Sequence, residues 1–162
     1  TPDAAGSPIL NVTIRHGQPS DIPRMTELLG VLFSIESGFT PSRTIQRRGL
    51  EMLLGGPPER ALVLVAESRS EVVGMVTVQT LISTAEGGRV GLVEDLVVDG
   101  RFRSQGTGRR LLEEVIAWAG KAGLTRIQLL ADQANAPALR FYYHAGWSRT
   151  GMICIRKSLI PS

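Results

Sequence analysis

The segment RFRSQGTGRR (101–110) has the clearest chemical signature in the sequence, because it places Gly106 and Gly108 between two groups of arginines. Glycine opens backbone conformations that other residues avoid, and it lets a ligand approach the main chain closely. An apolar run with helical spacing follows, so the turn would begin a helix whose first N–H groups have no partner inside the helix. These features predict that the turn binds an anion, and a phosphate group suits such a helix start.

Two common phosphate-binding motifs are excluded at individual positions. A P-loop requires a lysine and a hydroxyl residue after its last glycine, whereas Arg109 and Arg110 follow Gly108 here. A dinucleotide-binding fingerprint requires a third glycine, whereas Leu111 occupies that position. For the ten residues alone, the remaining alternative is an ordinary helix start with solvated arginines, and Arg101 is predicted to belong to such a solvated rim.

The longer segment VEDLVVDGRFRSQGTGRRLL resembles the acetyl-CoA-binding segment of the GCN5-related N-acetyltransferase (GNAT) superfamily. In that family a (Gln/Arg)-x-x-Gly-x-(Gly/Ala) turn cradles the pyrophosphate of coenzyme A, and Arg103, Gly106 and Gly108 match it. The segment NAPALRFYYHAGW (135–147) is similar to the family's next segment. The resemblance covers about residues 11–159 and implies a GNAT fold with acetyl-CoA as the acetyl donor.

The resemblance also implies where the donor would bind. A bulge in the family splays the strand before the turn from its neighbour, so that freed backbone groups pair with the pantetheine arm and one N–H polarises the thioester carbonyl. Asn135 matches a family residue that contacts this arm, and its alternative role is to cap a helix. The implied acetyl-CoA-binding residues are Leu96, Val97, Val98, Arg103, Ser104, Gln105, Gly106, Thr107, Gly108, Arg109 and Asn135.

Acetyl transfer to an amine needs a base, because an amine with a pKa of about 10.4 is protonated at neutral pH. Glu94 lies where the family often places an acid or a histidine, although a carboxyl of pKa about 4.3 would need a raised pKa or a water relay. Asp95 is the alternative base, since neighbouring strand residues face opposite sides and a bulge could exchange their roles. Otherwise these acids orient a neighbour or bind the positive charge of the substrate.

Tyr142 matches the family tyrosine that acts as the acid toward the leaving thiolate. A phenol of pKa about 10 is a weaker acid than a thiol of about 8.5, so a strong hydrogen bond to the thiolate would be most of its role. The alternative is an aromatic ring packed in the core beside Phe141 and Tyr143.

The acceptor pocket is expected at the junction of the first two helices (33–41), with the loop near 84–88, and the candidate specificity residues are Phe33, Glu36 and Phe39. No activated cysteine or serine is evident, so no covalent acyl-enzyme is expected and direct transfer in a ternary complex is favoured. The first candidate acceptor is a small primary amine. A peptide or protein amine is the second candidate acceptor. A coenzyme-A-binding module without catalysis is the competing class of function, and a nucleotide-binding regulatory domain is disfavoured by the missing motif residues.

The composition, and the positions of the histidines and the cysteine, bear on the other classes of function. A net charge of +3 is too small to indicate a nucleic-acid surface, and no apolar run approaches the length of about 20 residues that spans a membrane. His16 and His144 are not spaced as a metal pair, so no metal is predicted, and Cys154 is expected to pack within a strand. The single cysteine fits a reducing cytoplasm. The family often dimerises, which leaves a homodimer open.

The order of elements predicts an α/β fold with a mixed, mostly antiparallel central sheet flanked by helices. Residues 1–9 are expected to be a tail and 10–162 a single domain. Ser20 and Ser42 are expected to cap the first two helices, and Asn135 the last. The predicted strands are 11–16, 61–68, 71–83, 89–98, 126–132 and 152–159, and the predicted helices run from Ser20 to about Glu36, over 43–54 and 106–122, and from Asn135 to Ala145.

Overall fold

The computed structural model describes residues 11–36 and 38–160, so the tail expected at 1–9 lies outside the described residues. The chain divides after Leu129 into two compact units, which are treated separately below. A single domain over 10–162 therefore stays a prediction.

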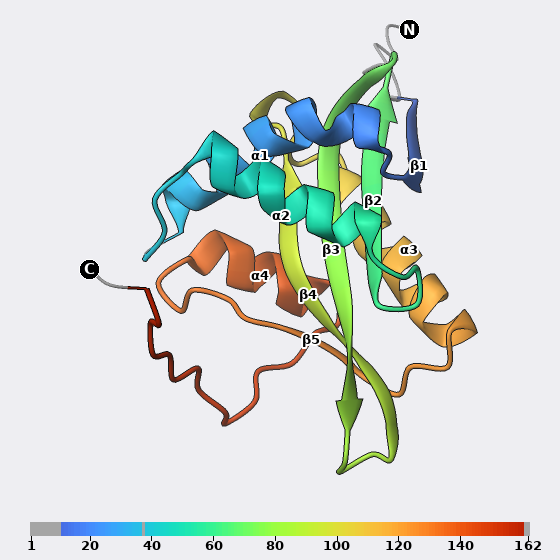
Figure 1. The fold of residues 1–162 in the computed structure, drawn as a ribbon, viewed down its shortest axis with the longest axis vertical. Helices are drawn as coiled ribbons and strands as arrows, with labels where there is room; N and C mark the ends of the chain where they lie inside the picture. Colours follow the sequence, from blue (N-terminus) through green and yellow to red (C-terminus); the bar gives the residue numbers. More distant parts are fainter. Residues whose placement is uncertain (1–10, 37, 161–162) are drawn as a thin grey trace, which may run out of the picture. The chain divides into compact units, whose positions relative to one another are not determined.

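The first unit is built on one five-stranded sheet with the strand order β1-β2-β3-β4-β5 (Figure 1). Neighbouring strands from β1 to β4 are antiparallel, and β5 pairs with β4 in parallel. The mixed, mostly antiparallel sheet is confirmed, and the crossover through α3 makes its one parallel pair. The strands are β1 Val12–His16, β2 Ala61–Ser68, β3 Glu71–Ser83, β4 Gly88–Val98 and β5 Ile127–Leu129.

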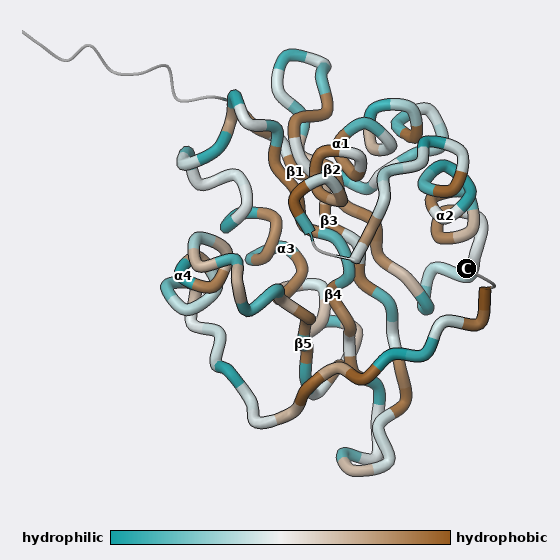
Figure 2. The backbone as a smooth tube through the Cα atoms, turned by 90° about the vertical axis from the view of Figure 1, so that its left-hand side faces the viewer, coloured by the Kyte–Doolittle hydropathy of each residue, from teal (hydrophilic) through white to brown (hydrophobic). Residues whose placement is uncertain are grey.

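Three helices cover the two faces of this sheet. Figure 2 shows α3 (Thr107–Lys121) on one side of the strands and the pair α1 (Ile22–Ile35) and α2 (Arg43–Gly55) on the other. Each helix turns an apolar stripe toward the sheet, as its 3.6-residue periodicity predicts. The core cluster under α1 and α2 consists of Ile22, Met25, Leu28, Leu29, Leu50, Val63, Val65, Val72, Met75 and Val97, and α3 buries Leu111, Leu112, Val115 and Ala119.

The first helix begins differently from its prediction. A 3-10 turn, η1 (Pro19–Asp21), precedes α1, and the residue at the N-cap of α1 is Asp21, so the cap predicted at Ser20 is wrong. The Asp21 carboxylate accepts the Gln18 N–H at 2.8 Å and a fork of two bonds from Arg15 at 2.8 and 2.9 Å. A carboxylate can accept several bonds at once, so Asp21 connects the start of the helix to β1. Ser42 occupies the predicted N-cap position of α2 without a capping bond from its side chain.

The second unit contains α4 (Ala136–His144), which begins and ends as predicted. Asn135 is its N-cap and accepts the Ala138 N–H at 3.2 Å, while Gly146 follows the helix with a φ of 89°. The strand predicted at 152–159 is wrong: the described residues after α4 form neither helix nor strand. Cys154, expected to pack within that strand, is exposed, as are Met152, Ile153, Ile155 and Leu159. Alternation marks a possible strand face, but a strand also needs a partner backbone to bond its N–H and C=O groups.

Candidate functional site

The glycine turn opens α3 without any side-chain cap. Gly106 is the N-cap residue with a left-handed φ of 81°, and Ser104 before it also has a positive φ of 60°. The first described backbone bond of the helix runs from the Arg110 N–H to the Gly106 carbonyl at 3.0 Å. A Cβ added at Gly106 would meet no atom within 4 Å, so space for a ligand lies beside the backbone here. The first-turn N–H groups, including those of Thr107 and Gly108, therefore fit an anion, and the helix dipole favours one.

The arginines around this turn are engaged with the protein itself. Arg101, predicted to be part of a solvated rim, is exposed but makes ion pairs with Asp99 at 2.9 Å and Glu71 at 2.7 Å. Arg103 Nε donates to the Val98 carbonyl at 3.1 Å, and Arg109 pairs with the carboxylate one helical turn further on, that of Glu113, at 3.1 Å. Arg110 donates to the Val12 carbonyl, and Gln105 Nε2 donates to the Arg101 carbonyl at 3.3 Å. The backbone of the turn, more than these side chains, is therefore presented to a ligand.

Strand β4 carries a bulge next to its predicted functional segment. Thr77 of β3 lies opposite Asp95 and Val78 opposite Val93, so Glu94 is the extra residue between them. The parallel pairing with β5 covers only 91–93 of β4, whereas Leu96, Val97 and Val98 continue to pair with β3 on the other side. In the described sheet, the pairing of β4 with β5 therefore ends at Val93, and Leu96, Val97 and Val98, where freed backbone groups are expected, have no strand partner on the β5 side.

The two acidic candidates sit in different environments. Asp95 Oδ2 accepts a hydrogen bond at 2.8 Å from the hydroxyl of Thr77, which is fully buried. Asp95 and Val97 lie two residues apart on one face of β4, and Val97 belongs to the core cluster under α1 and α2. Burial raises the pKa of Asp95, and the Thr77 hydrogen bond lowers it in part. Glu94 is exposed at the bulge.

The predicted acceptor residues cluster at the C-terminal end of α1. The rings of Phe33 and Phe39 stack with their centroids 5.4 Å apart, and Phe33 packs against the core cluster. Glu36 is the C-cap residue of α1, and its N–H donates to the Leu32 carbonyl at 3.1 Å. The loop near 84–88, expected beside this junction, instead forms the tip of the β3–β4 hairpin, which Figures 1 and 2 both show at the end of the sheet away from α1 and α2.

A pocket of about 360 Å³ opens between α1 and α2. Ser34 and Pro41 of the predicted junction line it, together with Thr26, Glu27, Gly30, Val31, Arg43 and Gln46. Phe33, Glu36 and Phe39 are not among its lining residues. The acceptor role of Phe33, Glu36 and Phe39 therefore stays a prediction.

Tyr142 and Asn135 belong to the second unit. The Tyr142 ring lies 5.3 Å from that of Phe141 and 5.9 Å from that of Trp147, centroid to centroid. The Trp147 N–H also donates to the Tyr142 carbonyl at 3.0 Å. Tyr142 therefore has aromatic neighbours on the helix and just beyond it, and Asn135 has the capping role that was its alternative.

Sequence reasoning missed Thr77, Arg24 and Asp99. Thr77 could have been found only from the strand register, and the bulge changes that register by one residue. No sequence pattern indicated a role for Arg24, because its partner Asp99 lies 75 residues further along the chain. Within the described residues, no group of three or more His, Cys, Asp or Glu could hold a metal ion, and no helix is long and apolar enough to cross a membrane.

The family model described as "Acetyltransferase (GNAT) family" matches residues 23–147, and the chain belongs to this family. It is 28% identical over 94 residues to the uncharacterized N-acetyltransferase YhfO of Bacillus subtilis, a match that covers 57% of this chain and 63% of the relative. It is 35% identical over 81 residues to an uncharacterized N-acetyltransferase of Archaeoglobus fulgidus, which covers 49% and 55%. The chain thus spans less than two thirds of either relative.

Solved structures share the fold at low sequence identity. An aminoglycoside N-acetyltransferase in complex with CoA superposes with a TM-score of 0.78 at 14% identity, over 93% of this chain and 96% of that one. An aminoglycoside acetyltransferase from an uncultured soil metagenomic sample, in complex with sisomicin, gives 0.74 at 20% identity, over 92% and 97%. These similarities confirm the GNAT fold.

Proposed function

We propose that this protein transfers the acetyl group of acetyl-CoA directly to a primary amine of a small molecule. The observation that carries the proposal is the uncapped N-terminus of α3, opened by Gly106 in a left-handed conformation directly after β4. Membership of the GNAT family supports an acyl-CoA donor for this turn. The structural neighbour solved with CoA supports the same donor, and the one solved with sisomicin supports a small-molecule acceptor.

The donor's pyrophosphate would be held by backbone N–H groups at the start of α3. Charge-assisted hydrogen bonds contribute about 1.5–3 kcal/mol each, against about 0.3–2 kcal/mol for the helix dipole, so the donors dominate binding. The β5-facing edge of β4 at Leu96, Val97 and Val98 would pair with the pantetheine arm, as a missing neighbouring strand would. Arg103, Arg109 and Gln105, which lie around the turn, are proposed to adjust this binding. Asn135, the cap of α4, is proposed to contact the arm.

The proton of the acceptor ammonium is proposed to leave through the acidic pair on β4. Asp95 is the better supported base, because burial raises its pKa and it lies on the sheet face covered by α1 and α2. Glu94, at the bulge, is the second candidate and would act through water. The neutral amine then attacks the thioester carbonyl, and the C–S bond breaks as the new C–N bond forms. The proton that the nitrogen loses in this step goes to the departing thiolate, which gives the amide and free coenzyme A.

Tyr142 is proposed to donate its phenol hydrogen bond to the departing thiolate. The rings of Phe141 and Trp147 beside it would hold the phenol in one orientation. Phe33, Glu36 and Phe39 are proposed to select the acceptor. Stacked aromatic rings suit an apolar part of a ligand, and a carboxylate beside them suits its ammonium group.

The test is release of free coenzyme A thiol from acetyl-CoA with a panel of small amines, polyamines, aminoglycosides and peptides. We expect turnover with at least one small amine. Turnover with peptides alone would assign a peptide or protein acceptor instead. Tight CoA binding without turnover on any amine would indicate a non-catalytic binding module, and no CoA binding at all would refute the proposal.

A further inference from the structure

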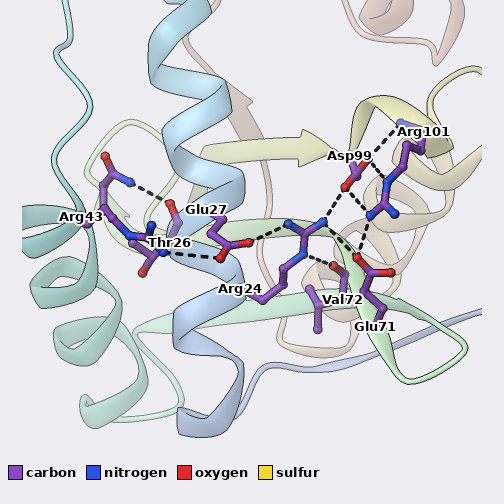
Figure 3. A network of polar contacts seen from close by, with 9 residues as sticks. Arg24, Thr26, Glu27, Arg43, Glu71, Val72, Asp99 and Arg101 are labelled. Atoms are coloured by element: carbon purple, nitrogen blue, oxygen red, sulfur yellow. Dashed lines mark hydrogen bonds and ion pairs between the residues drawn. The ribbon is translucent and has the colours of Figure 1, made fainter.

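A cluster of four charged residues lies where β4 passes into the glycine turn (Figure 3). It consists of Arg24 from α1, Glu71 at the start of β3, and Asp99 and Arg101 after β4, and we call it the clamp. Asp99 and Arg101 lie in the segment that resembles the family, but none of the four residues is a matched position of its glycine turn. The site described above gives them no role in binding or catalysis. Their charges balance, so the clamp as a whole does not attract an anion.

Both oxygens of Asp99 are occupied within the clamp. Oδ1 accepts the Arg101 backbone N–H at 2.9 Å and Arg101 Nε at 3.1 Å. Oδ2 accepts Arg101 Nη2 at 2.9 Å and Arg24 Nη2 at 2.5 Å. The Asp99 side chain is only 15% exposed, and hydrogen bonds from Arg101 hold its pKa well below the ordinary value, against burial, which raises it. Asp99 therefore stays ionised and fixed in one position.

Arg24 attaches this carboxylate to the rest of the unit. Its Nε donates to the Val72 carbonyl at 2.9 Å and its Nη1 to Glu27 at 2.9 Å. With the bond from Nη2 to Asp99, all three nitrogens of the guanidinium donate hydrogen bonds. The planar fork of arginine makes such an arrangement rigid, which a lysine could not reproduce. The start of the turn is thereby tied to α1 and β3.

The turn needs such support, because Ser104 within it is held in a left-handed conformation that non-glycine residues avoid. Ser104 and Gly106 both have positive φ, and a non-glycine residue in this region persists only where the surroundings impose it. A chain of bonds runs from Asp99 into the turn: the Phe102 N–H donates to the Asp99 carbonyl at 2.8 Å, and Gln105 Nε2 to the Arg101 carbonyl at 3.3 Å. Convergence of the first-turn N–H groups on one anion depends on this geometry.

We propose that Arg24 and Asp99 are positioning residues for donor binding: they hold the β4–α3 turn in the conformation whose backbone N–H groups bind the pyrophosphate of coenzyme A. The inference rests on the proposed function, because it assumes that this turn binds the donor. For one variant, the inference predicts a change in CoA affinity opposite to the change that charge alone predicts. Asp99→Asn removes a negative charge beside an anion site, which by charge alone would strengthen CoA binding, whereas loss of positioning weakens it.

The test is the dissociation constant of coenzyme A, measured by calorimetry on the full chain. We expect Asp99→Asn and Arg24→Gln to weaken CoA binding about 10-fold or more, as loss of a precise site geometry does. Arg24→Lys should restore little, because the fork is lost. The matched control is Arg47→Gln, which breaks an exposed ion pair of 2.8 Å with Glu51 on α2 and should leave CoA affinity unchanged.

Amide NMR spectra give the readout that separates positioning from general destabilisation. In Asp99→Asn without ligand, the signals of Gly106, Thr107 and Gly108 should shift or broaden, while those of core residues such as Met75 stay in place. Should this variant fail to fold, Glu71→Gln decides the matter, since it removes one exposed partner of the clamp and should weaken CoA binding by a smaller factor.

The outcomes distinguish the inference from the proposed function. Folded variants that bind CoA as tightly as the wild type, or more tightly in the case of Asp99→Asn, overturn the inference and leave the function standing. A wild-type protein that does not bind CoA overturns both. Spectral changes spread across the whole sheet would assign the clamp a general structural role and would also overturn the inference.

Discussion

At the scale of single residues, the chemistry depends on small differences between neighbours. Glu94 and Asp95 are adjacent acids, yet the bulge leaves one exposed and turns the other toward a buried threonine. Desolvation disfavours the ionised carboxylate, so burial makes Asp95 a stronger base than an ordinary aspartate. Gly106 likewise matters for its backbone angle, since it has no close neighbour.

Asp95→Asn should lower kcat/KM for the amine by about 100-fold or more, the usual contribution of a general base. In the wild type, the acidic limb of the pH–rate profile should lie above the ordinary Asp pKa of about 3.9. Thr77→Val removes the hydrogen bond that lowers the Asp95 pKa, so this limb should move to higher pH. Initial-rate profiles of the three proteins and of Glu94→Gln provide the measurement.

The stability of the same variant gives a second check. Because the folded-state pKa of Asp95 is raised, its ionisation destabilises the folded protein as the pH rises above the unfolded value of about 3.9. Asp95→Asn should therefore be more stable than the wild type at pH 7 in urea unfolding, and the difference should fade toward pH 3. A variant less stable at pH 7 would contradict the burial argument.

Gly106→Ala should destabilise the protein by about 1–2 kcal/mol and weaken CoA binding, because an alanine strains a left-handed backbone even where space is available. Gly120 in the same helix is the matched control: it also has no neighbour within 4 Å of an added Cβ, but its φ is not positive. Gly120→Ala should be neutral or stabilising by up to about 1 kcal/mol. Thermal unfolding with and without CoA measures both effects.

At the scale of elements, the ends of helices are set by side chains that the local sequence only partly reveals. Asn135 caps α4 where a capping residue was predicted, because the capping bond spans only three residues. The start of α1 differs, since Asp21 is held by Arg15 of β1, which in turn donates to Glu67 of β2 at 2.6 Å. Contacts among three elements therefore set the position of Asp21 at the start of α1, which is a tertiary feature.

Asp21→Asn should destabilise the protein at neutral pH by about 1.5–3 kcal/mol, the contribution of a charge-assisted hydrogen bond. Hydrogen bonds from Arg15 lower the Asp21 pKa, against burial, which raises it. The contribution is therefore fully present above the unfolded pKa of about 3.9 and is lost as the pH falls through the lower folded value. Urea unfolding at pH 7 and pH 3.5 tests this.

The control for that experiment is Ser20→Ala, which removes the residue that the sequence alone suggested as the cap. Its effect should stay within about 0.5 kcal/mol, as is usual for an exposed position. A larger loss for Ser20→Ala than for Asp21→Asn would mean that the sequence-based assignment of the cap was right.

At the scale of the whole molecule, the residues with proposed roles fall in two units that are each described by themselves. The glycine turn, the β5-facing edge of β4 and Asp95 belong to the first, and Asn135 and Tyr142 to the second. A ligand that binds only the folded state stabilises whichever part it contacts, by about 2.7 kcal/mol at a concentration of 100 times Kd.

Hydrogen exchange with and without CoA should therefore show protection in two separate segments, one at 103–110 and the other at 135–142. The N-terminal backbone amides of α3 should be protected because they donate to the ligand, and those of α4 because its cap residue contacts the pantetheine arm. Protection confined to 103–110 would show that the second unit does not share the donor site. Exchange in the sheet core at 63–65 serves as the reference.

The sequence by itself determined the mixed sheet, the helix after the glycine turn and the family, because these depend on local periodicity and on a motif of closely spaced residues. Tertiary structure alone decided three things: the pairing that gives Asp95 its buried partner Thr77, the clamp that brings Arg24 to Asp99, and the lack of a strand at 152–159. Each depends on residues far apart in the chain. Burial and strand register arise only when distant segments meet, so no local pattern encodes them.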